Sequence, residues 1–214
     1  MVKYKVAIVI PAFNEAATIF DVVQSVKEYG VVIVVDDAST DNTRQLAVNA
    51  GATVISHNEN KGYDEALNSG FIEADKCDFD AVITFDADGQ HSSKMLKKYI
   101  DNLKKGIDLV LGVRPKPARF SERIFMFYTR IRFGWKDPLC GMKGYSMKLY
   151  RSQGYFDSYN SIGTELAFTG LMNGFSYVQL PIVIIRRIDT PRFDTTIRSN
   201  WKIFKSLLKM IFLR

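Results

Sequence analysis

Residues 81–91 of the chain read AVITFDADGQH. The first five residues are apolar or β-branched and have the length of a buried strand, and a polar segment follows without a break. In that segment Asp86 and Asp88 stand two positions apart, where two carboxylates repel each other unless a cation or hydrogen-bond donors lie between them. Whether this pattern, an apolar run followed by polar residues, recurs along the chain decides the fold.

The pattern recurs through the first half of the chain. Short apolar runs that predict strands lie at residues 5–10, 31–35, 53–56, 81–85 and 108–112. Apolar residues at helical spacing separate these runs, for example Ile19, Val22, Val23 and Val26. Strands that alternate with helices predict an α/β fold, with a Rossmann-like, mostly parallel sheet flanked by helices.

Polar residues follow four of the expected strands. They are Asn14 and Glu15, then Asp36 and Asp37, then residues 58–62, and finally residues 86–91. Sheets of this type bind ligands outside the carboxyl ends of their strands. The four polar segments are therefore expected to meet in one site.

The side chains in these segments suit a metal ion and a phosphorylated ligand. Asp86, Asp88 and Gln90 offer oxygen ligands for Mg²⁺ or Mn²⁺, which also bind substrate phosphates. Asp37 could accept hydrogen bonds from a nucleobase or a ribose, and Lys61 is a point charge for phosphate. Each segment alone is weak evidence and is also consistent with a turn or a helix N-cap.

Composition narrows the class of protein. The 214 residues carry a net charge of +6, and the part from Arg114 onward is rich in Arg and Lys, which suits anionic lipid, nucleic acid or a phosphorylated substrate. Cys77 and Cys140 do not form a zinc motif or a disulfide framework, so reduced thiols are expected. The N-terminal apolar run is too short for a signal peptide and no stretch reaches the ~20 apolar residues of a membrane span, so we expect a cytoplasmic protein.

The second half of the chain is less regular, and no linker divides it into domains. Residues 140–144 predict a flexible loop, and residues 163–173 predict a helix. Glu165 opens that helix, where it either stabilises the helix dipole or acts as a general base. Residues 197–214 predict a basic amphipathic helix, which could pack on a partner, in the core or on a membrane surface.

Taken in order, these motifs resemble those of the family 2 glycosyltransferases, and most closely the dolichol-phosphate mannosyltransferase-like branch. The matching segments are residues 10–15 (IPAFNE), 34–41 (VVDDASTD), 60–62 (NKG), 85–91 (FDADGQH), 112–114 (GVR), 137–144, 165–174 and 180–182 (LPI). The resemblance implies a metal-dependent glycosyltransferase with a GT-A fold and a smaller acceptor-binding C-terminal part.

The resemblance and the residue chemistry together assign roles. The expected donor-binding residues are Pro11, Phe13, Glu15, Asp37, Lys61 and Asp86, the metal ligands are Asp86, Asp88 and Gln90, and the catalytic residues are Asp88, Arg114 and Glu165. Family members with these motifs invert the anomeric carbon, and the metal offsets the charge of the departing nucleoside diphosphate.

The acceptor decides whether a base is needed. A polyprenyl phosphate is already anionic and needs none, whereas a sugar hydroxyl needs one, and Glu165 is then the candidate. Phosphate-acceptor enzymes of this branch carry Arg-x-x-Gly-x-Ser-Lys after the last strand. Residues 186–193 keep basic residues there but lack the Gly and Ser positions, which weakens the case for a lipid-phosphate acceptor.

We therefore expect one GT-A domain over residues 1–214, with a nucleotide-sugar-binding half (1–113), an acceptor half (114–196) and a terminal helix (197–214) in peripheral contact with the inner face of the cell membrane. The expected reaction moves a sugar from a UDP- or GDP-linked donor to a lipid-linked, polyprenyl-phosphate-type acceptor. A saccharide hydroxyl in cell-surface glycan assembly is the first alternative, and a nucleotidyltransferase is a different class. No nucleic-acid partner is expected, and a homo-oligomer stays open.

Overall fold

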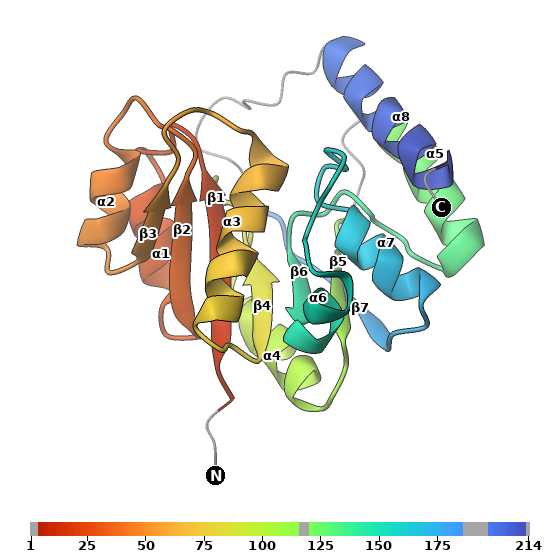
Figure 1. Cartoon of the computed structure of the whole chain (residues 1–214), viewed down its shortest axis with the longest axis horizontal. Helices are drawn as coiled ribbons and strands as arrows, with labels where there is room; N and C mark the ends of the chain where they lie inside the picture. The colour runs from red at the N-terminus through yellow and green to blue at the C-terminus, as the bar shows by residue number, and fades with distance from the viewer. Residues whose placement is uncertain (1–3, 116–119, 186–196, 213–214) are drawn as a thin grey trace.

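The computed structural model describes residues 4–115, 120–185 and 197–212, and in them seven strands form one sheet (Figure 1). The strands are β1 (Val6–Ala12), β2 (Val31–Asp36), β3 (Thr53–Ser56), β4 (Ala81–Thr84), β5 (Leu109–Val113), β6 (Lys143–Ser146) and β7 (Tyr177–Pro181). The helices are α1 (Ile19–Val26), α2 (Thr43–Asn49), α3 (Tyr63–Lys76), α4 (Leu96–Lys104), α5 (Phe120–Phe133), α6 (Met147–Gln153), α7 (Glu165–Met172) and α8 (Ile197–Phe212), with a 3-10 turn η1 (Ser93–Met95) before α4.

The predicted α/β fold is confirmed. The five strands expected in the first half are present as β1 to β5, and the order across the sheet is β3-β2-β1-β4-β6-β5-β7. β1 to β4 pair in parallel with their neighbours among themselves, and β5 pairs in parallel with β7. The sheet is therefore mostly parallel, and the polar segments that follow β1, β2 and β4 meet at one edge.

β6 is the strand that the sequence pattern did not predict. The flexible loop expected at residues 140–144 is wrong for Lys143 and Gly144, which begin β6 and pair antiparallel with both β4 and β5. The strand is only four residues long and contains a lysine and a glycine, so no apolar run marks it. Glycine fits here because a Cβ on Gly144 would lie 3.2 Å from side-chain atoms of Leu103 and Tyr99 in α4.

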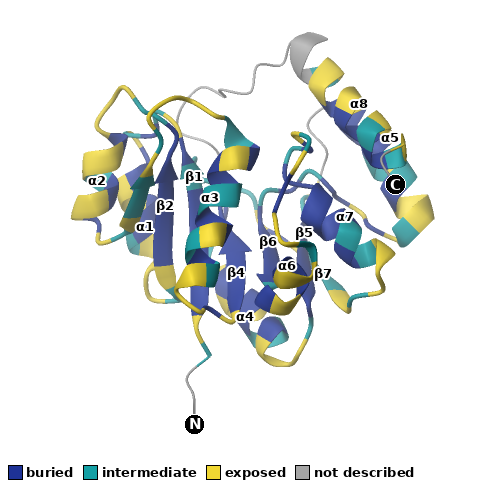
Figure 2. Ribbon diagram, in the orientation of Figure 1, coloured by how far each residue is buried: buried dark blue, intermediate teal, exposed yellow. Residues whose placement is uncertain are grey.

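Helices cover both faces of the sheet. Successive side chains of β1 point to opposite faces, so Ile8 and Ile10 enter the core shared with α1 and α4, while Ala7 and Val9 enter the core shared with α3. The helices turn their buried sides toward the sheet (Figure 2). Each fully buried Val or Ile contributes about 1.5–3 kcal/mol, so this packing fixes the strand ends and the loops that follow them.

α8 confirms the helix expected at the end of the chain and lies beside α5 at the edge of the molecule (Figure 1). Its buried side carries Ile203, Leu207 and Met210, whereas the aromatic side that includes Trp201 is exposed. In the three described segments, every helix is too short or too polar to cross a bilayer. Residues 186–193, where the branch motif is altered, lie outside the described residues, and the division of the chain near residues 113 and 196 stays a prediction.

Candidate functional site

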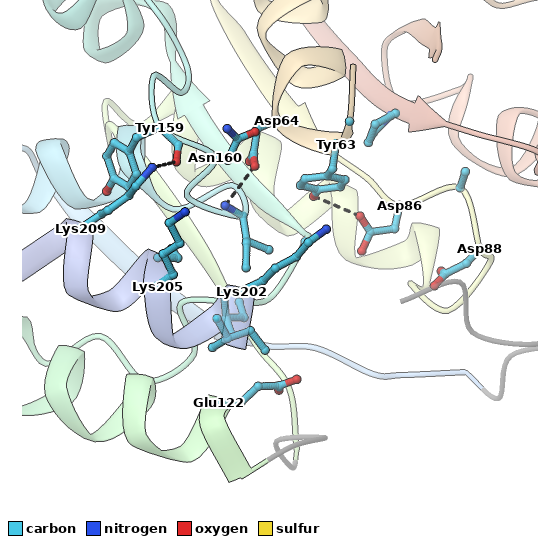
Figure 3. A pocket seen from close by; sticks show the side chains of 18 of the residues that line it. Tyr63, Asp64, Asp86, Asp88, Glu122, Tyr159, Asn160, Lys202, Lys205 and Lys209 are labelled. Atoms are coloured by element: carbon cyan, nitrogen blue, oxygen red, sulfur yellow. Dashed lines mark hydrogen bonds between the residues drawn. The ribbon is translucent and has the colours of Figure 1, made fainter. Parts of the chain in front are cut away.

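A cavity of about 630 Å³ lies between the polar loops at the strand ends and α8 (Figure 3). A second cavity of about 360 Å³ shares Asp86, Arg114, Leu139 and Gly141 with the first. The predicted residues that line one or both cavities are Pro11, Glu15, Asp86, Asp88, Gln90 and Arg114. These residues lie at or after the ends of β1, β4 and β5, so the sheet brings together part of the predicted set.

Asp86 follows β4 and lines both cavities. Its Oδ1 accepts a hydrogen bond from the hydroxyl of Tyr63 at 3.3 Å, and its Oδ2 lies 2.9 Å from Nε2 of His91. Burial alone would raise the pKa of Asp86, but the hydrogen bond and charge of His91 and the charge of Lys143 bring that pKa below its ordinary value. Asp86 is therefore held as a carboxylate, the state that a cation requires.

Asp88 shapes the turn that carries Gln90. Its Oδ1 accepts a hydrogen bond from the backbone N–H of Gln90 at 3.0 Å. Gly89 between them has a φ of 72°, in the left-handed region that glycine adopts at little cost. The turn therefore holds a carboxylate and an amide close to Asp86.

Gly141 packs against Asp86 from the other side. A Cβ built on Gly141 would collide with the carboxyl group of Asp86. The carbonyl of Gly141 accepts a hydrogen bond from Oγ1 of Thr84 at 2.6 Å, which ties this segment to the end of β4. A side chain at position 141 would displace the carboxylate.

The oxygens of Asp86, Asp88 and Gln90 fit a divalent cation that also binds phosphate. Among residues 4–115, 120–185 and 197–212, no three His, Cys, Asp or Glu side chains form a group that could hold a metal. Mg²⁺ is commonly held by one or two carboxylates together with substrate phosphates and water. The chemistry of this donor set suits Mg²⁺ or Mn²⁺ together with phosphate oxygens, and the role of the three residues as metal ligands stays a prediction.

Arg114 follows β5 and is held by two acids. Its Nε and Nη2 each donate to Asp137 at 2.8 Å, and Nη2 also donates to Oε2 of Glu122 at 3.0 Å. Burial alone would lower the pKa of Arg114, but the hydrogen bond and charge of Asp137, with the charge of Glu122, raise it. Arg114 is a fixed cation at the cavity wall. No sequence signal marked Glu122, which stands in a segment of apolar residues and arginines.

Four predicted residues, all described, lie outside both cavities: Phe13, Asp37, Lys61 and Glu165. Asp37 is buried, and its carboxylate accepts backbone hydrogen bonds from Lys61 at 2.9 Å and Gly62 at 2.7 Å. Its Oδ1 also lies 2.6 Å from Nδ1 of His57. Asp37 thus fastens the third polar segment to the end of β2. The roles of Phe13, Asp37 and Lys61 toward a ligand stay predictions.

Glu165 begins α7 as expected but is buried, with 7% of its surface exposed. Its carboxylate accepts hydrogen bonds from the backbone N–H of Ser158 at 2.6 Å and the hydroxyl of Ser158 at 2.8 Å. Burial raises the pKa of Glu165, and the bonds from Ser158 oppose that rise. These contacts stabilise the loop before α7, and a role as general base stays a prediction.

Three lysines of α8 line the side of the cavity opposite Asp86 (Figure 3). They are Lys202, Lys205 and Lys209. Lys209 donates to the carbonyl of Tyr159 at 2.9 Å, and Lys202 extends from α8 toward Tyr63 and Asp86 in Figure 3. Their spacing predicted one polar helix face, but the sequence could not show that this face borders the strand-end loops.

Asp64 is a buried carboxylate of the cavity that had no signal in the sequence. It accepts backbone hydrogen bonds from Ile162 at 3.1 Å and Gly163 at 2.5 Å, and so joins α3 to the loop before α7. Burial, and next the charge of Asp157, raise the pKa of Asp64 to about 7, against the opposing effect of these N–H groups and of Lys143.

The family model of glycosyl transferase family 2 matches residues 7–159 of the chain. A UDP-N-acetylglucosamine–dolichyl-phosphate N-acetylglucosaminyltransferase of Methanococcus voltae is 26% identical, over 95% of this chain and 94% of the relative. A dolichyl-phosphate hexose transferase of Haloferax volcanii is 25% identical, over 95% of this chain and 92% of the relative.

Solved structures show the same fold. Glucosyl-3-phosphoglycerate synthase of Mycobacterium tuberculosis in complex with Mn²⁺ and UDP-glucose superposes with a TM-score of 0.77 at 24% identity, over 97% of this chain and 79% of that chain. The same enzyme in complex with Mg²⁺ and UDP gives a TM-score of 0.80 at 23% identity, again over 97% and 79%. The predicted GT-A fold is confirmed by these matches.

The contact between Gly141 and Asp86 can be tested with Gly141→Ala. The added methyl group should push the Asp86 carboxylate out of place and abolish the rise in melting temperature that UDP with Mn²⁺ gives the wild-type chain. Asp86→Asn should behave in the same way, whereas Ser158→Ala, away from the cation site, should keep the rise. A full Mn²⁺-dependent rise in the Gly141→Ala variant would contradict the assigned geometry.

The buried Asp64 predicts a dependence of stability on pH. Because its folded pKa of about 7 lies above the ordinary 3.8, folding favours the protonated form, so its contribution to the free energy of unfolding falls as pH rises from about 4 to about 7. The free energy of unfolding of the wild type, relative to that of Asp64→Asn, should fall across this window by on the order of 2–4 kcal/mol in urea unfolding. Asp78→Asn, at an exposed position, should follow the wild-type profile. A flat difference would refute the assignment.

Proposed function

The chain belongs to glycosyl transferase family 2, and from that premise we propose that it moves a sugar, with inversion, from a nucleotide-sugar donor to a polyprenyl-phosphate-type lipid at the cytoplasmic face of a membrane. One observation carries the choice of acceptor. The cavity has an acidic side at the strand ends and a basic side on α8, where Lys202, Lys205 and Lys209 stand. A basic wall opposite the donor site suits an acceptor that is itself an anion.

The donor side accounts for the acidic wall. Asp86, Asp88 and Gln90 would hold Mg²⁺ or Mn²⁺, which when bound neutralises charge on the diphosphate that leaves. Pro11 and Glu15 line the same cavity at the end of β1, where they would contact the nucleoside of the donor. A UDP-linked sugar is the first donor to test, because the solved relative binds UDP-glucose and the Methanococcus voltae relative is named for a UDP-sugar.

The acceptor side favours a phosphate over a hydroxyl. A phosphate oxygen needs no proton removed before it attacks, whereas a hydroxyl needs a base within hydrogen-bond reach. Glu165 lies outside both cavities with its carboxylate bonded to Ser158. Lys202 and Lys205 would attract the anionic head of the lipid, and Arg114 would hold its charge near the sugar phosphate.

Two alternatives to this function were a saccharide-hydroxyl acceptor and a nucleotidyltransferase. Transfer to a saccharide hydroxyl keeps the family and the donor and changes only the acceptor, so it stays the second candidate. A nucleotidyltransferase is excluded, because the chain is a member of a glycosyltransferase family. The relatives whose names include dolichyl phosphate support the lipid acceptor for this chain.

Steady-state kinetics with UDP-sugars and a short-chain polyprenyl phosphate tests the basic wall. The double variant Lys202→Ala/Lys205→Ala should raise the KM for the polyprenyl phosphate by about tenfold, corresponding to about 1.4 kcal/mol of lost attraction, with little change in the KM for the donor. The control Lys98→Ala/Lys104→Ala removes two exposed lysines of α4 and should change neither constant. An unchanged acceptor KM in the first variant would count against the phosphate site.

Glu165→Gln separates the two acceptors. With a phosphate acceptor its turnover should stay within about threefold of wild type, because no general base is required. Loss of a general base would lower turnover by about 10²–10⁴-fold. A loss of that size, with an unchanged melting temperature, would favour the saccharide hydroxyl and refute the phosphate reading.

A further inference from the structure

We propose that α5 and α8 together form a docking surface for an anionic lipid bilayer. The surface, called here the α5–α8 surface, consists of Phe120, Ile124, Phe127 and Ile131 on α5 and Trp201, Phe204, Leu208 and Phe212 on α8. The sequence predicts membrane contact through residues 197–214 alone. The structure adds the exposed apolar side of α5, to which the proposed function assigns no role.

Each helix carries its apolar stripe on the side away from the protein core. On α5 the stripe residues are spaced by four, three and four positions, and Phe120, Phe127 and Ile131 are each about 70% exposed (73%, 68% and 71%). On α8 the spacing is three, four and four, with Trp201 63% and Phe212 77% exposed. Exposed apolar groups in such a row indicate an interaction site. Figure 2 shows exposed residues along the outer side of α8.

The two stripes face the same way. The helices run side by side in the same direction, and Oγ of Ser121 donates to Oδ1 of Asn200 at 2.6 Å, which joins their first turns (Figure 1). Successive residues of a helix are rotated by about 100° about its axis. By this rotation the apolar stripe of each helix points roughly 90° away from the neighbouring helix. The stripe also lies on the side opposite the buried Phe125 in α5 and the buried Met210 in α8. Two parallel stripes on one side make a continuous apolar strip two helices wide.

Cations border this strip on both long edges. Helical rotation puts the exposed Arg123 and Arg130 on the far edge of α5, and Lys205 on the far edge of α8. The sequence of the two helices contains one acidic residue, Glu122, which is buried against Arg114. An apolar strip with basic borders and an exposed tryptophan is the pattern of a helix pair that lies in the interface of an anionic membrane.

The positive charge along the borders of the α5–α8 surface favours an anionic bilayer over a second copy of the chain. A two-fold contact through the same strip would bring basic borders of both copies together without acidic partners. A bilayer that contains anionic lipid offers negative charge at the borders and apolar chains at the centre. The surface itself does not rest on the proposed function, but the idea that the docked membrane supplies the acceptor does. On docking, Lys202 and Lys205 would lie between the lipid headgroups and the cavity.

Cosedimentation of the full chain with vesicles tests the surface in the absence of donor and acceptor. The wild-type chain should bind phosphatidylcholine vesicles that contain phosphatidylglycerol more tightly than vesicles of phosphatidylcholine alone. Phe127→Ser/Ile131→Ser, which leaves residues 197–214 intact, should weaken binding by about tenfold or more. Trp201→Ser/Phe212→Ser should do the same. The control Val48→Ser/Ile72→Ser removes exposed apolar residues of α2 and α3 and should bind like wild type.

Wild-type binding by the Phe127→Ser/Ile131→Ser variant, with weak binding only in the α8 variant, would overturn the shared surface. The proposal would also be overturned if the wild-type chain were a dimer in sedimentation equilibrium and the α5 variant or the α8 variant were a monomer. The surface would then bind a second copy of the chain. Melting temperatures equal to wild type would confirm that the variants fold. A chain that binds vesicles but transfers no sugar would refute the proposed function and support the α5–α8 surface. A chain that transfers sugar but does not bind vesicles would support the proposed function and refute the surface.

Discussion

The close approach of Gly141 to Asp86 is the contact on which the arrangement of the site depends. It joins two parts of the chain, the strand end after β4 and the segment that leads into β6. Oγ1 of Thr84 holds the carbonyl of Gly141 at 2.6 Å and accepts a hydrogen bond from the backbone of Lys143 at 3.1 Å. Because Gly141 has no side chain, the Asp86 carboxylate can lie against it and face both cavities. A β6 inserted between β4 and β5 is what makes this contact reachable.

A second junction lies in residues 157–163, which connect the sheet to α8. Asn160 and Ile162 adopt left-handed backbone conformations with φ of 58° and 61°. Asparagine tolerates this region, but for the β-branched Ile162 it costs about 1–2 kcal/mol. Asp64 bonds the backbone of Ile162, and Lys143 donates to the carbonyl of Gly163 at 3.0 Å. Side chains of α3 and β6 thus offset the strain and hold this loop at the cavity. Ser206 of α8 donates to Ser161 at 2.8 Å and completes the junction.

Local pattern explains why part of this could be predicted from the sequence. Strands β1 to β5 are apolar runs that end in polar residues, so both their type and the position of Asp86 and Asp88 followed from short-range signals. β6 had no such signal, because its position depends on pairing with strands that lie far away in the chain. The inward turn of Asp37 depends on Gly62, a partner 25 positions away in the chain. Glu165 is bonded to Ser158 in the loop just before α7, and the path of an irregular loop has no periodic signal in the sequence.

In α8 the periodicity of apolar residues predicts the helix but not which of its sides is buried. The helix has apolar residues on two sides, Ile203, Leu207 and Met210 on one and Trp201, Leu208 and Phe212 on another, with the lysines between them. A hydrophobic pattern reports that both sides exist but not which one meets the protein. Only the packing against α5 decides that the larger, aromatic side stays outside. Because the basic side then faces the cavity, one helix presents its three sides to the core, to the site and to the surroundings. A membrane on its outer side would therefore reach the site through the lysines of that same helix.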